Sequence, residues 1–365
     1  MNSKWDYQTI GDVCTVERGG SPRPIDDYIT ESCDGINWIK IGDTDDSMYI
    51  TKTAQKIRPE GMKKSRYVQP GDFLLSNSMS FGRPYILKID GCIHDGWLVL
   101  RDNNNRFDKR FLYYYLSSKT TYQRFKAMAV GGVVNNLNSE MVRKVSVPIP
   151  CMNEQSEIAD LLDSVNNVIQ ERNRELALFD DLIKARFVEM FGNPITNSQN
   201  RPTTEFINVV KMQRGFDLPV QDRHQDGSIP VYGSNGALDH HDIAKIHGGG
   251  VITGRSGTIG KVFYTEEDYW PLNTSLFSVD THGNNVVYLA YLLEMYDLSR
   301  FVEGTGVPTL NRNMFHNKQI IEVDLEEQSS FANFVKQVDK SKVAIQKSLD
   351  ETQLLFDSLM QKYFG

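Results

Sequence analysis

The chain has 365 residues, of which 40% are apolar, and it contains four cysteines without any CxxC spacing. This length suits two domains with connectors, and the apolar content is enough for real cores. No run of 18 or more apolar residues occurs, so we expect no membrane-spanning helix. The N-terminal segment lacks the apolar region of a signal peptide, and we expect reduced thiols in a cytoplasmic protein.

The net charge of −7 argues only weakly against nucleic-acid binding, because the charge is unevenly distributed. Residues 1–150 carry 21 Lys and Arg against 17 Asp and Glu, so the acidic excess belongs to the rest of the chain. Net charge governs solubility and long-range steering and does not decide what a local face binds. A basic or polar binding face on an acidic chain therefore stays possible.

The chain contains one segment twice. Residues 154–192 end in MFG and residues 327–365 end in YFG, and the two align without a gap at an offset of 173. In both, apolar residues recur at spacings of three and four, which predicts an amphipathic helix. Each helix would be roughly 55 Å long at about 1.5 Å per residue, longer than one small globule needs. We expect each apolar stripe to pack on the other helix; packing of each helix on its own globule is the alternative.

The stripes predict which side chains form the seam of a coiled coil. Val165, Leu176 and Leu349 are expected to be buried in it. The full predicted interface consists of Ile158, Leu162, Val165, Ile169, Leu176, Ile183, Phe187, Phe331, Val335, Val338, Ile345, Leu349, Phe356 and Met360.

The segments that precede the two helices also correspond to each other. Residues 10–19 match residues 206–215 at an offset of 196, and residues 71–83 match residues 249–261 at an offset of 178. The offset falls to 173 further on, so the second segment has shorter loops. Short β-rich runs alternate with turn signals in both, which favours mixed α/β domains. One scaffold with divergent loops is typical of two domains that bind different ligands.

The predicted fold class is α+β. Two similar mixed α/β domains, residues 1–150 and 193–322, are expected to be separated by an antiparallel coiled coil of two long helices, residues 151–192 and 323–365, with pseudo-twofold symmetry. The helices should be antiparallel because the chain must leave the first helix, build the second domain and return along the first helix.

Motifs for catalysis are not recognisable. Asn193-Pro194 is not followed by the Pro-aromatic pair of amino-methyltransferases, and no GxGxxG follows a predicted strand. Residues 254–261 fail the spacing of a phosphate-binding loop, and the histidines in residues 240–247 lack a matching Cys or carboxylate pattern. We therefore expect no catalytic residue, no cofactor and no metal. A DNA methyltransferase or nuclease with unrecognised motifs remains the alternative.

Polar, glycine-rich turns recur at equivalent places in both halves. Asn, Ser, Thr and Arg are side chains that reach base edges and phosphates. The same residue types also dominate ordinary turns, but their recurrence in both halves favours function. The candidate DNA contacts are Arg18, Arg23, Ser76, Asn77, Ser78, Arg83, Asn135, Asn136, Arg214, Ser234, Asn235, Arg255, Ser256, Thr258, Lys261 and Arg312.

Several segments together carry a family resemblance. They are PIP with EQSEIADLL at the start of the first helix, FVEMFGNP at its end, IPVYGSNG (229–236), ITGRSGTIGK (252–261) and the terminal QLLFDSLMQKYFG. Over essentially its whole length the chain resembles the specificity (S) subunit of type I restriction-modification systems. The helical repeats are the more specific part of this resemblance.

The resemblance implies a non-catalytic subunit with two target-recognition domains. Each domain would bind one half of a bipartite target in double-stranded DNA. The coiled coil would act as a spacer and dock two methyltransferase (M) subunits, and restriction (R) subunits would join through the assembled complex, away from any membrane. A scaffold whose two domains bind proteins instead of DNA is a third hypothesis, and salt-dependent DNA binding would separate the two.

Overall fold

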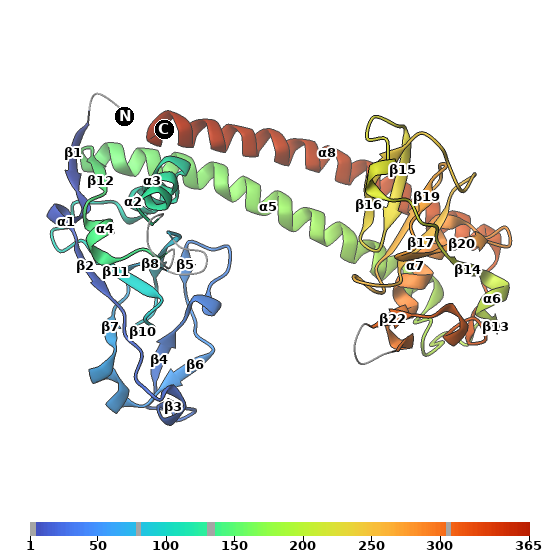
Figure 1. Ribbon diagram of the computed structural model, residues 1–365, viewed down its shortest axis with the longest axis horizontal. Helices are drawn as coiled ribbons and strands as arrows, with labels where there is room; N and C mark the ends of the chain where they lie inside the picture. Colours follow the sequence, from blue (N-terminus) through green and yellow to red (C-terminus); the bar gives the residue numbers. More distant parts are fainter. Residues whose placement is uncertain (1–4, 78–81, 130–135, 304–307) are drawn as a thin grey trace. The chain divides into compact units, whose positions relative to one another are not determined.

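The structure is a computed structural model that describes residues 5–77, 82–129, 136–303 and 308–365 (Figure 1). It divides into two compact units. The first comprises Met1–Glu171 and Leu349–Gly365, and the second comprises Arg172–Ser348. Each unit therefore contains one half of each long helix.

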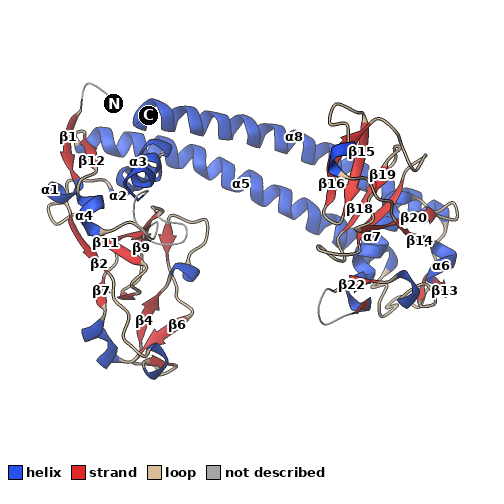
Figure 2. Ribbon diagram, in the orientation of Figure 1, coloured by secondary structure: helices blue, strands red, loops and turns tan. Residues whose placement is uncertain are grey.

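The first unit is built on two five-stranded sheets with a small two-stranded sheet beside them (Figure 2). The strand orders are β2-β11-β8-β9-β5, β3-β6-β4-β10-β7 and β1-β12. The strands are β1 (Asp6–Thr9), β2 (Thr15–Arg18), β3 (Ile29–Thr30), β4 (Ile36–Ile39), β5 (Tyr49–Ile50), β6 (Gln55–Ile57), β7 (Arg66–Val68), β8 (Phe73–Ser76), β9 (Pro84–Leu87), β10 (Gly91–Ile93), β11 (Trp97–Arg101) and β12 (Ser146–Ile149). The helices before α5 are α1 (Ile10–Val13), α2 (Lys109–Ser117), α3 (Lys119–Ala129) and α4 (Ser139–Arg143).

The second unit repeats the first in reduced form. Its sheets are β14-β20-β17-β18, β16-β15-β19, β13-β23 and β21-β22. The strands are β13 (Thr203–Glu205), β14 (Lys211–Arg214), β15 (Ile229–Gly233), β16 (Gly236–His241), β17 (Gly250–Gly254), β18 (Val262–Thr265), β19 (Trp270–Pro271), β20 (Ser275–Asp280), β21 (Val302–Glu303), β22 (Thr309–Leu310) and β23 (Gln319–Ile321), with helices α6 (Phe206–Val209) and α7 (Val286–Tyr296). Short 3-10 turns complete both units.

Four strands of the central sheet correspond one to one between the two units. β2, β11, β8 and β9 take the places of β14, β20, β17 and β18, and the parallel pair β4–β10 matches the parallel pair β15–β19. The second unit has smaller sheets: its central sheet has four strands instead of five, and its outer sheet has three instead of five. This is the shared scaffold with different loops that the sequence offsets predict.

The two long helices are α5 (Met152–Phe191) and α8 (Leu325–Phe364), each with 40 residues. Within each unit they lie side by side and run in opposite directions (Figure 1). In the first unit, Ile158 and Leu162 of α5 share a core with Phe364 at the end of α8. In the second unit, Phe187 of α5 packs edge-on against Phe331 near the start of α8. No helix in the described part of the chain is long and apolar enough to cross a membrane.

The helices pack on the domains as well as on each other. The first half of α5 belongs to the core of the first unit, and its second half belongs to the core of the second unit. The two possibilities that the sequence left open are therefore both realised. At the ends of each helix, the apolar stripe is wide enough to contact both the other long helix and a domain.

Most of the predicted seam is buried, but four members are not. Leu176, Ile345, Phe356 and Met360 are only half-buried, which corrects the expectation for Leu176. Leu176 and Ile345 belong to neither domain core, so little besides the other helix can cover them. The buried members are Ile158, Leu162, Val165, Ile169, Ile183, Phe187, Phe331, Val335, Val338 and Leu349.

A buried glutamine joins each long helix to its domain. In the first unit, Gln155 Nε2 donates to the carbonyls of Arg106 (2.9 Å) and Pro150 (3.0 Å), and its Oε1 accepts from Asp108 N at 2.9 Å. Asp108 in turn caps α2, because its carboxylate accepts from the first backbone amides of that helix.

The second unit builds the same joint with Gln328, which lies 173 residues after Gln155. Its Nε2 donates to Val323 O (2.8 Å) and Asn284 Oδ1 (2.7 Å), and its Oε1 accepts from Asn285 N at 2.9 Å. Asn285 caps α7 as Asp108 caps α2. Because a buried amide must satisfy its donors and acceptors, this joint fixes the start of the long helix relative to the domain helix.

The seam can be tested with two leucines of α8. Leu349→Ala should destabilise the protein by about 2 kcal/mol or more, because it empties a buried site. Leu354→Ala makes the same change in the same helix at a side chain that is 72% exposed, and it should alter stability by less than about 0.5 kcal/mol. Thermal and urea unfolding of both variants check this. Equal stability of the two variants would place the stripe outside the core.

Candidate nucleic-acid interface

The polar turns identified in the sequence have the same backbone framework in both units. The loop after β8 and the loop after β17 each close on themselves and are each tied to two other segments at corresponding positions. The matching pairs of bonds are Ser76 N to Arg83 O (3.1 Å) with Gly254 N to Lys261 O (3.2 Å), Asn77 N to Gly96 O (2.9 Å) with Arg255 N to Thr274 O (2.9 Å), and Leu137 N to Asn77 O (3.0 Å) with Leu310 N to Arg255 O (2.9 Å).

A glycine directly after β2, and another directly after β14, allows this framework to close. A Cβ on Gly19 would lie 2.2 Å from His94 O, and a Cβ on Gly215 would lie 2.3 Å from Leu272 O. Real Cβ atoms do not approach a carbonyl oxygen so closely, so both positions require glycine. The segment after Gly19 therefore lies close to the loop between β10 and β11, and the segment after Gly215 lies close to the loop between β19 and β20.

In the first unit this contact is organised by the carboxylate of Asp95. Its Oδ1 accepts from Ser21 Oγ at 2.9 Å and lies 3.2 Å from His94 Nε2, and its Oδ2 lies 3.4 Å from Arg23 Nη2. Burial alone would raise the pKa of Asp95. The hydrogen bond from Ser21 and the nearby charges outweigh that effect, and the pKa is lowered. Asp95 is therefore a charged acceptor with several donors around it.

The main chain of Asp95 holds two further side chains. Its carbonyl oxygen accepts from Asn77 Nδ2 at 3.0 Å and from Arg18 Nε at 3.2 Å. Arg18 is exposed, and because Nε makes this bond its two Nη groups remain available for an acceptor on another molecule. Asn77 is buried, so it supports the loop from inside.

The second unit has the same arrangement with different side chains. Arg255 stands where Asn77 stands, and its Nη1 lies 3.5 Å from the carbonyl oxygen of Asn273, the counterpart of Asp95. The side-chain amide of Asn273 donates to the carboxylate of Asp217, the counterpart of Ser21. We call these two sets the polar hubs: Ser21, Asn77 and Asp95 in the first unit, and Asp217, Arg255 and Asn273 in the second.

Around the second hub the structure gathers several predicted contacts. Lys261 Nζ lies 3.1 Å from Asn235 Oδ1, and Ser256 forms a backbone bridge with Thr309. Arg214 ends β14 opposite Leu276, at the same end of the sheet as Arg255. Residues from four separate segments therefore meet at one end of this unit.

The predicted DNA contacts differ in accessibility. Ser76 and Asn77 are buried, so in this structure they can position the loop but cannot touch a ligand. The exposed candidates are Arg18, Arg23, Arg83, Asn136, Arg214, Asn235 and Lys261, and the half-buried ones are Ser234, Arg255, Ser256, Thr258 and Arg312. Ser78 and Asn135 lie outside the described residues. Arg83 extends to Asp46 Oδ1 at 3.2 Å and to Asp45 O at 3.1 Å.

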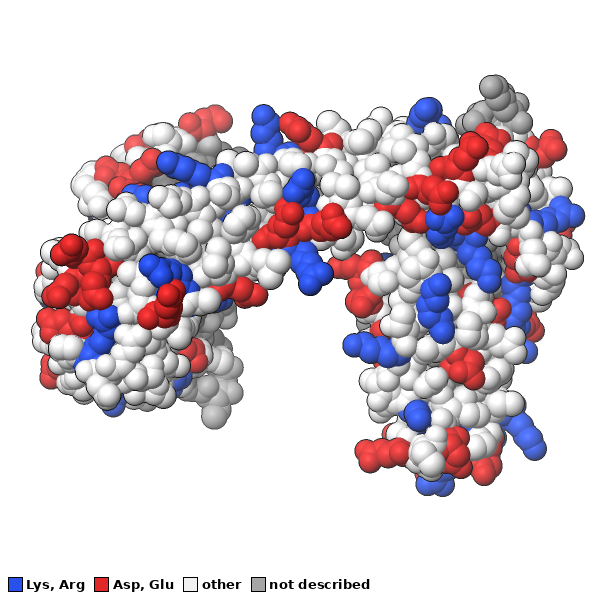
Figure 3. Space-filling view, turned by 180° about the vertical axis from the view of Figure 1, so that it is seen from behind, with Lys and Arg blue, Asp and Glu red and all other residues white. Residues whose placement is uncertain are grey.

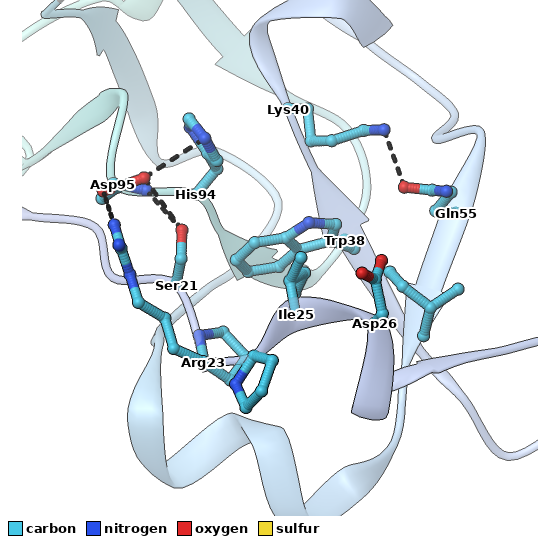
Figure 4. Close-up of a pocket in the computed structure, with 12 residues that line it drawn as sticks. Ser21, Arg23, Ile25, Asp26, Trp38, Lys40, Gln55, His94 and Asp95 are labelled. Atoms are coloured by element: carbon cyan, nitrogen blue, oxygen red, sulfur yellow. Dashed lines mark hydrogen bonds and ion pairs between the residues drawn. The ribbon is translucent and has the colours of Figure 1, made fainter.

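A hollow of about 580 Å³ opens beside the first hub (Figure 4). Ser21, Arg23, Lys40 and Asp95 are among the residues that line it, and Trp38 forms part of its wall. Trp38 is almost fully buried, so it shapes the wall and offers little surface for stacking.

In the parallel strand pair beside each hub, the two units place a tryptophan on opposite strands. Trp38 is paired with Cys92 across two parallel strands in the first unit, and Val231 is paired with Trp270 at the same place in the second. A large and a small side chain have changed places, so each pair combines one tryptophan with one smaller side chain. This supports the correspondence of the two units at the level of individual residues.

Charges on the two units are mixed. Figure 3 shows basic and acidic side chains interleaved on the face in view, without a broad area of one sign on either unit. The described residues contain no group of three or more His, Cys, Asp or Glu side chains arranged to hold a metal ion. On this face, therefore, no broad basic area offers itself to a polyanion.

Sequence reasoning missed four of the six hub members: Ser21, Asp95, Asp217 and Asn273. A signal for them exists, because Ser21 and Asp217 are related by the offset of 196 that relates residues 10–19 to 206–215. Asp95 and Asn273 are likewise related by the offset of 178. The pairs differ in residue type, so no motif connects them until the fold shows that they face each other.

Comparison with known proteins identifies the scaffold. Residues 2–178 and 197–352 match the family described as type I restriction modification DNA specificity domain. The chain belongs to this family. The two matches fall on the two halves of the chain, so the family's domain occurs twice, as the internal repeat predicts.

Members of this specificity family are also its relatives in sequence and fold. The MjaIX specificity subunit of Methanocaldococcus jannaschii is 23% identical over 208 residues, which are 56% of this chain and 46% of the relative. The putative MjaX specificity subunit of the same organism is 26% identical over 197 residues, which are 51% of this chain and 45% of the relative. The chain spans about half the length of these curated relatives.

The crystal structure of a type I restriction-modification S subunit from M. genitalium matches the fold. The TM-score is 0.62 at 16% identity, and the match covers 100% of this chain and 98% of the other. At this identity the likeness concerns the fold, which is that of two similar α/β domains combined with an antiparallel pair of long helices.

The glycine requirement gives a test of the framework. Gly19→Ala should destabilise the first unit by about 1–3 kcal/mol, because the new Cβ collides with the carbonyl of His94. Gly42→Ala is the matched control, since a Cβ there meets nothing within 4 Å. Thermal unfolding and amide exchange in residues 93–97 measure the effect. Wild-type stability and exchange in Gly19→Ala would show that the contact is not closed in solution.

Proposed function

We propose that this chain is a DNA sequence-specificity subunit that reads a bipartite target in double-stranded DNA. The observation that carries the proposal is the pair of polar hubs. They use equivalent positions and equivalent hydrogen bonds to present different side chains. Two copies of one scaffold with different polar groups suit the reading of two different half-sites.

Four exposed or half-buried cations around the hubs are the proposed DNA contacts. Arg18 and Arg23 in the first unit, and Arg255 and Lys261 in the second, lie on or beside the hub loops. Arginine can donate two parallel hydrogen bonds to guanine, whereas an exposed lysine more often meets a phosphate. The other exposed or half-buried candidates are proposed as additional contacts, and Ser76 and Asn77 as supports of the loop.

The proposed partners rest on the family to which the chain belongs and on the domain plan. The two domains, residues 1–150 and 193–322, would each bind one half-site, and the helices, residues 151–192 and 323–365, would set the distance between them. Half-sites about one DNA turn apart, roughly 34–36 Å, could be reached on one face of the duplex. We propose that the helices also dock two methyltransferase subunits and that restriction subunits join through this complex.

The proposed role is non-catalytic and needs no cofactor. The alternative is that the chain is itself a methyltransferase or nuclease. Purified chain should neither methylate nor cleave DNA on its own, and it should support sequence-specific methylation after methyltransferase subunits are added. Modification of DNA by the chain alone would favour the enzyme.

Two side chains of the second domain should contribute to DNA binding in different ways. Arg255→Ala should cost about 1–3 kcal/mol on the target sequence and relax one base position. Lys261→Ala should weaken binding to all sequences alike and reduce the salt dependence by about one ion. Binding of the assembled complex to target and unrelated duplexes at several salt concentrations checks both.

Lys336→Ala is the control for these variants, because Lys336 is an exposed lysine of α8 that pairs with Glu266 at 2.8 Å, away from the hub. It should leave affinity and salt dependence unchanged. If the double variant of Arg255 and Lys261 binds like wild type at every salt concentration, both residues belong to an ordinary surface turn.

The two half-sites should be separable. Replacing residues 195–322 by the second domain of another family member should change one half of the methylated target and leave the other half intact, because the hubs are built entirely within their own units. Mapping of methylated sites in cells that carry the hybrid measures this. A change in both halves, with a folded hybrid, contradicts independent reading.

A further inference from the structure

The hubs differ in where they place one carboxylate. In the first unit the carboxylate stands on the loop after β10, at Asp95, and faces the hydroxyl of Ser21. In the second unit it stands on the segment after β14, at Asp217, and faces the amide of Asn273. Each unit therefore has one carboxylate in this pair of facing positions. It lies before β11 in the first unit and after β14 in the second.

We infer that Asp95 and Asp217 are specificity-determining positioning residues, which fix the arginines of their domain for DNA reading. This inference rests on the proposed function and extends it to residues that need not touch DNA themselves. In the first unit the carboxylate of Asp95 lies 3.4 Å from Arg23 Nη2. The carbonyl of the same residue accepts from Arg18 Nε, a bond that does not depend on the side chain. In the second unit Asp217 holds Asn273, whose carbonyl lies at the guanidinium of Arg255.

The physical reason is that an arginine reads guanine only when its guanidinium plane is fixed. A bidentate contact needs both donors to point at O6 and N7 together, and a free arginine more readily neutralises a phosphate. The side chain of Arg23 is 81% exposed, so without Asp95 little else restrains it. A neighbouring carboxylate also lowers the gain from non-specific phosphate contacts, because it repels the DNA backbone.

Removal of the charge should therefore move two observables in opposite directions. In Asp95→Asn, the preference of the complex for target over unrelated DNA should fall roughly tenfold or more, which is the discrimination of one good base contact. Binding to unrelated DNA should become tighter, because a repelling charge is gone and Arg23 is released to phosphates. A purely structural role would weaken binding to both DNAs together.

The Asp217–Asn273 pair of the second unit suggests a double variant that should restore the function lost in Asp95→Asn. Ser21→Asp combined with Asp95→Asn rebuilds in the first unit the Asp217–Asn273 pair of the second, with the charge on the opposite side. We expect this double variant to bind unrelated DNA as weakly as wild type does and to recover part of the discrimination. Asp34→Asn is the control, because Asp34 pairs locally with Ser32 in the same unit and contacts neither arginine.

The experiment uses the full chain assembled with its methyltransferase subunits. Thermal unfolding first confirms that each variant is folded. Target and unrelated duplexes are then titrated, and methylated sites are mapped in cells, where Asp95→Asn should relax bases in one half of the target only. Unchanged discrimination in Asp95→Asn, or a double variant no different from Asp95→Asn, overturns the inference. Absence of sequence preference in the wild-type complex would instead overturn the proposed function.

Discussion

The buried amides of Gln155 and Gln328 are the interaction on which the rest of this architecture depends. Each joins three backbone or side-chain groups at the point where a long helix leaves its domain. An unpaired polar group at such a buried site would cost about 1–3 kcal/mol, so the direction of the helix and the cap of the domain helix are fixed together. Each domain is thus attached to the coiled coil by a defined joint.

The residue before each glutamine shows how one joint tolerates different surroundings. Glu154 accepts from Trp5 Nε1 at 3.0 Å, whereas Glu327 pairs with Arg201 at 2.8 Å. Trp5 and Arg201 are equivalent positions by the offset of 196. The carboxylate keeps a partner in both units although the chemistry of that partner differs. The hubs also keep one carboxylate while its position differs between the units, and the backbone hydrogen bonds around it are the same in both.

Placement at the end of a rigid sheet suits polar side chains that are held in one arrangement. The hub loops follow strands whose residues are almost all buried, and the backbone bonds that close them are repeated in both units. A loop tied at three points holds its polar groups in one arrangement, and a site held by a rigid scaffold can vary in chemistry without altering the fold. Because the backbone framework is separate from the side chains that it presents, the two domains carry different residue types at the hubs and share the same backbone hydrogen bonds.

The sequence alone determined the large features of this protein. Periodicity predicted both long helices, because apolar residues at spacings of three and four lie on one face of a helix. The gapless repeat predicted two related halves. The same stripe predicted the burial of Val165 and Leu349. It did not predict that Leu176 is only half-buried, because that depends on how far each domain core extends along the helix. Only the tertiary structure brought Ser21 to Asp95 and Asp217 to Asn273. These pairs lie on segments that follow β2 or β14 and precede β11 or β20, strands that are far apart in the chain and adjacent in the sheet. A hydrogen bond between different residue types leaves no pattern in a single sequence.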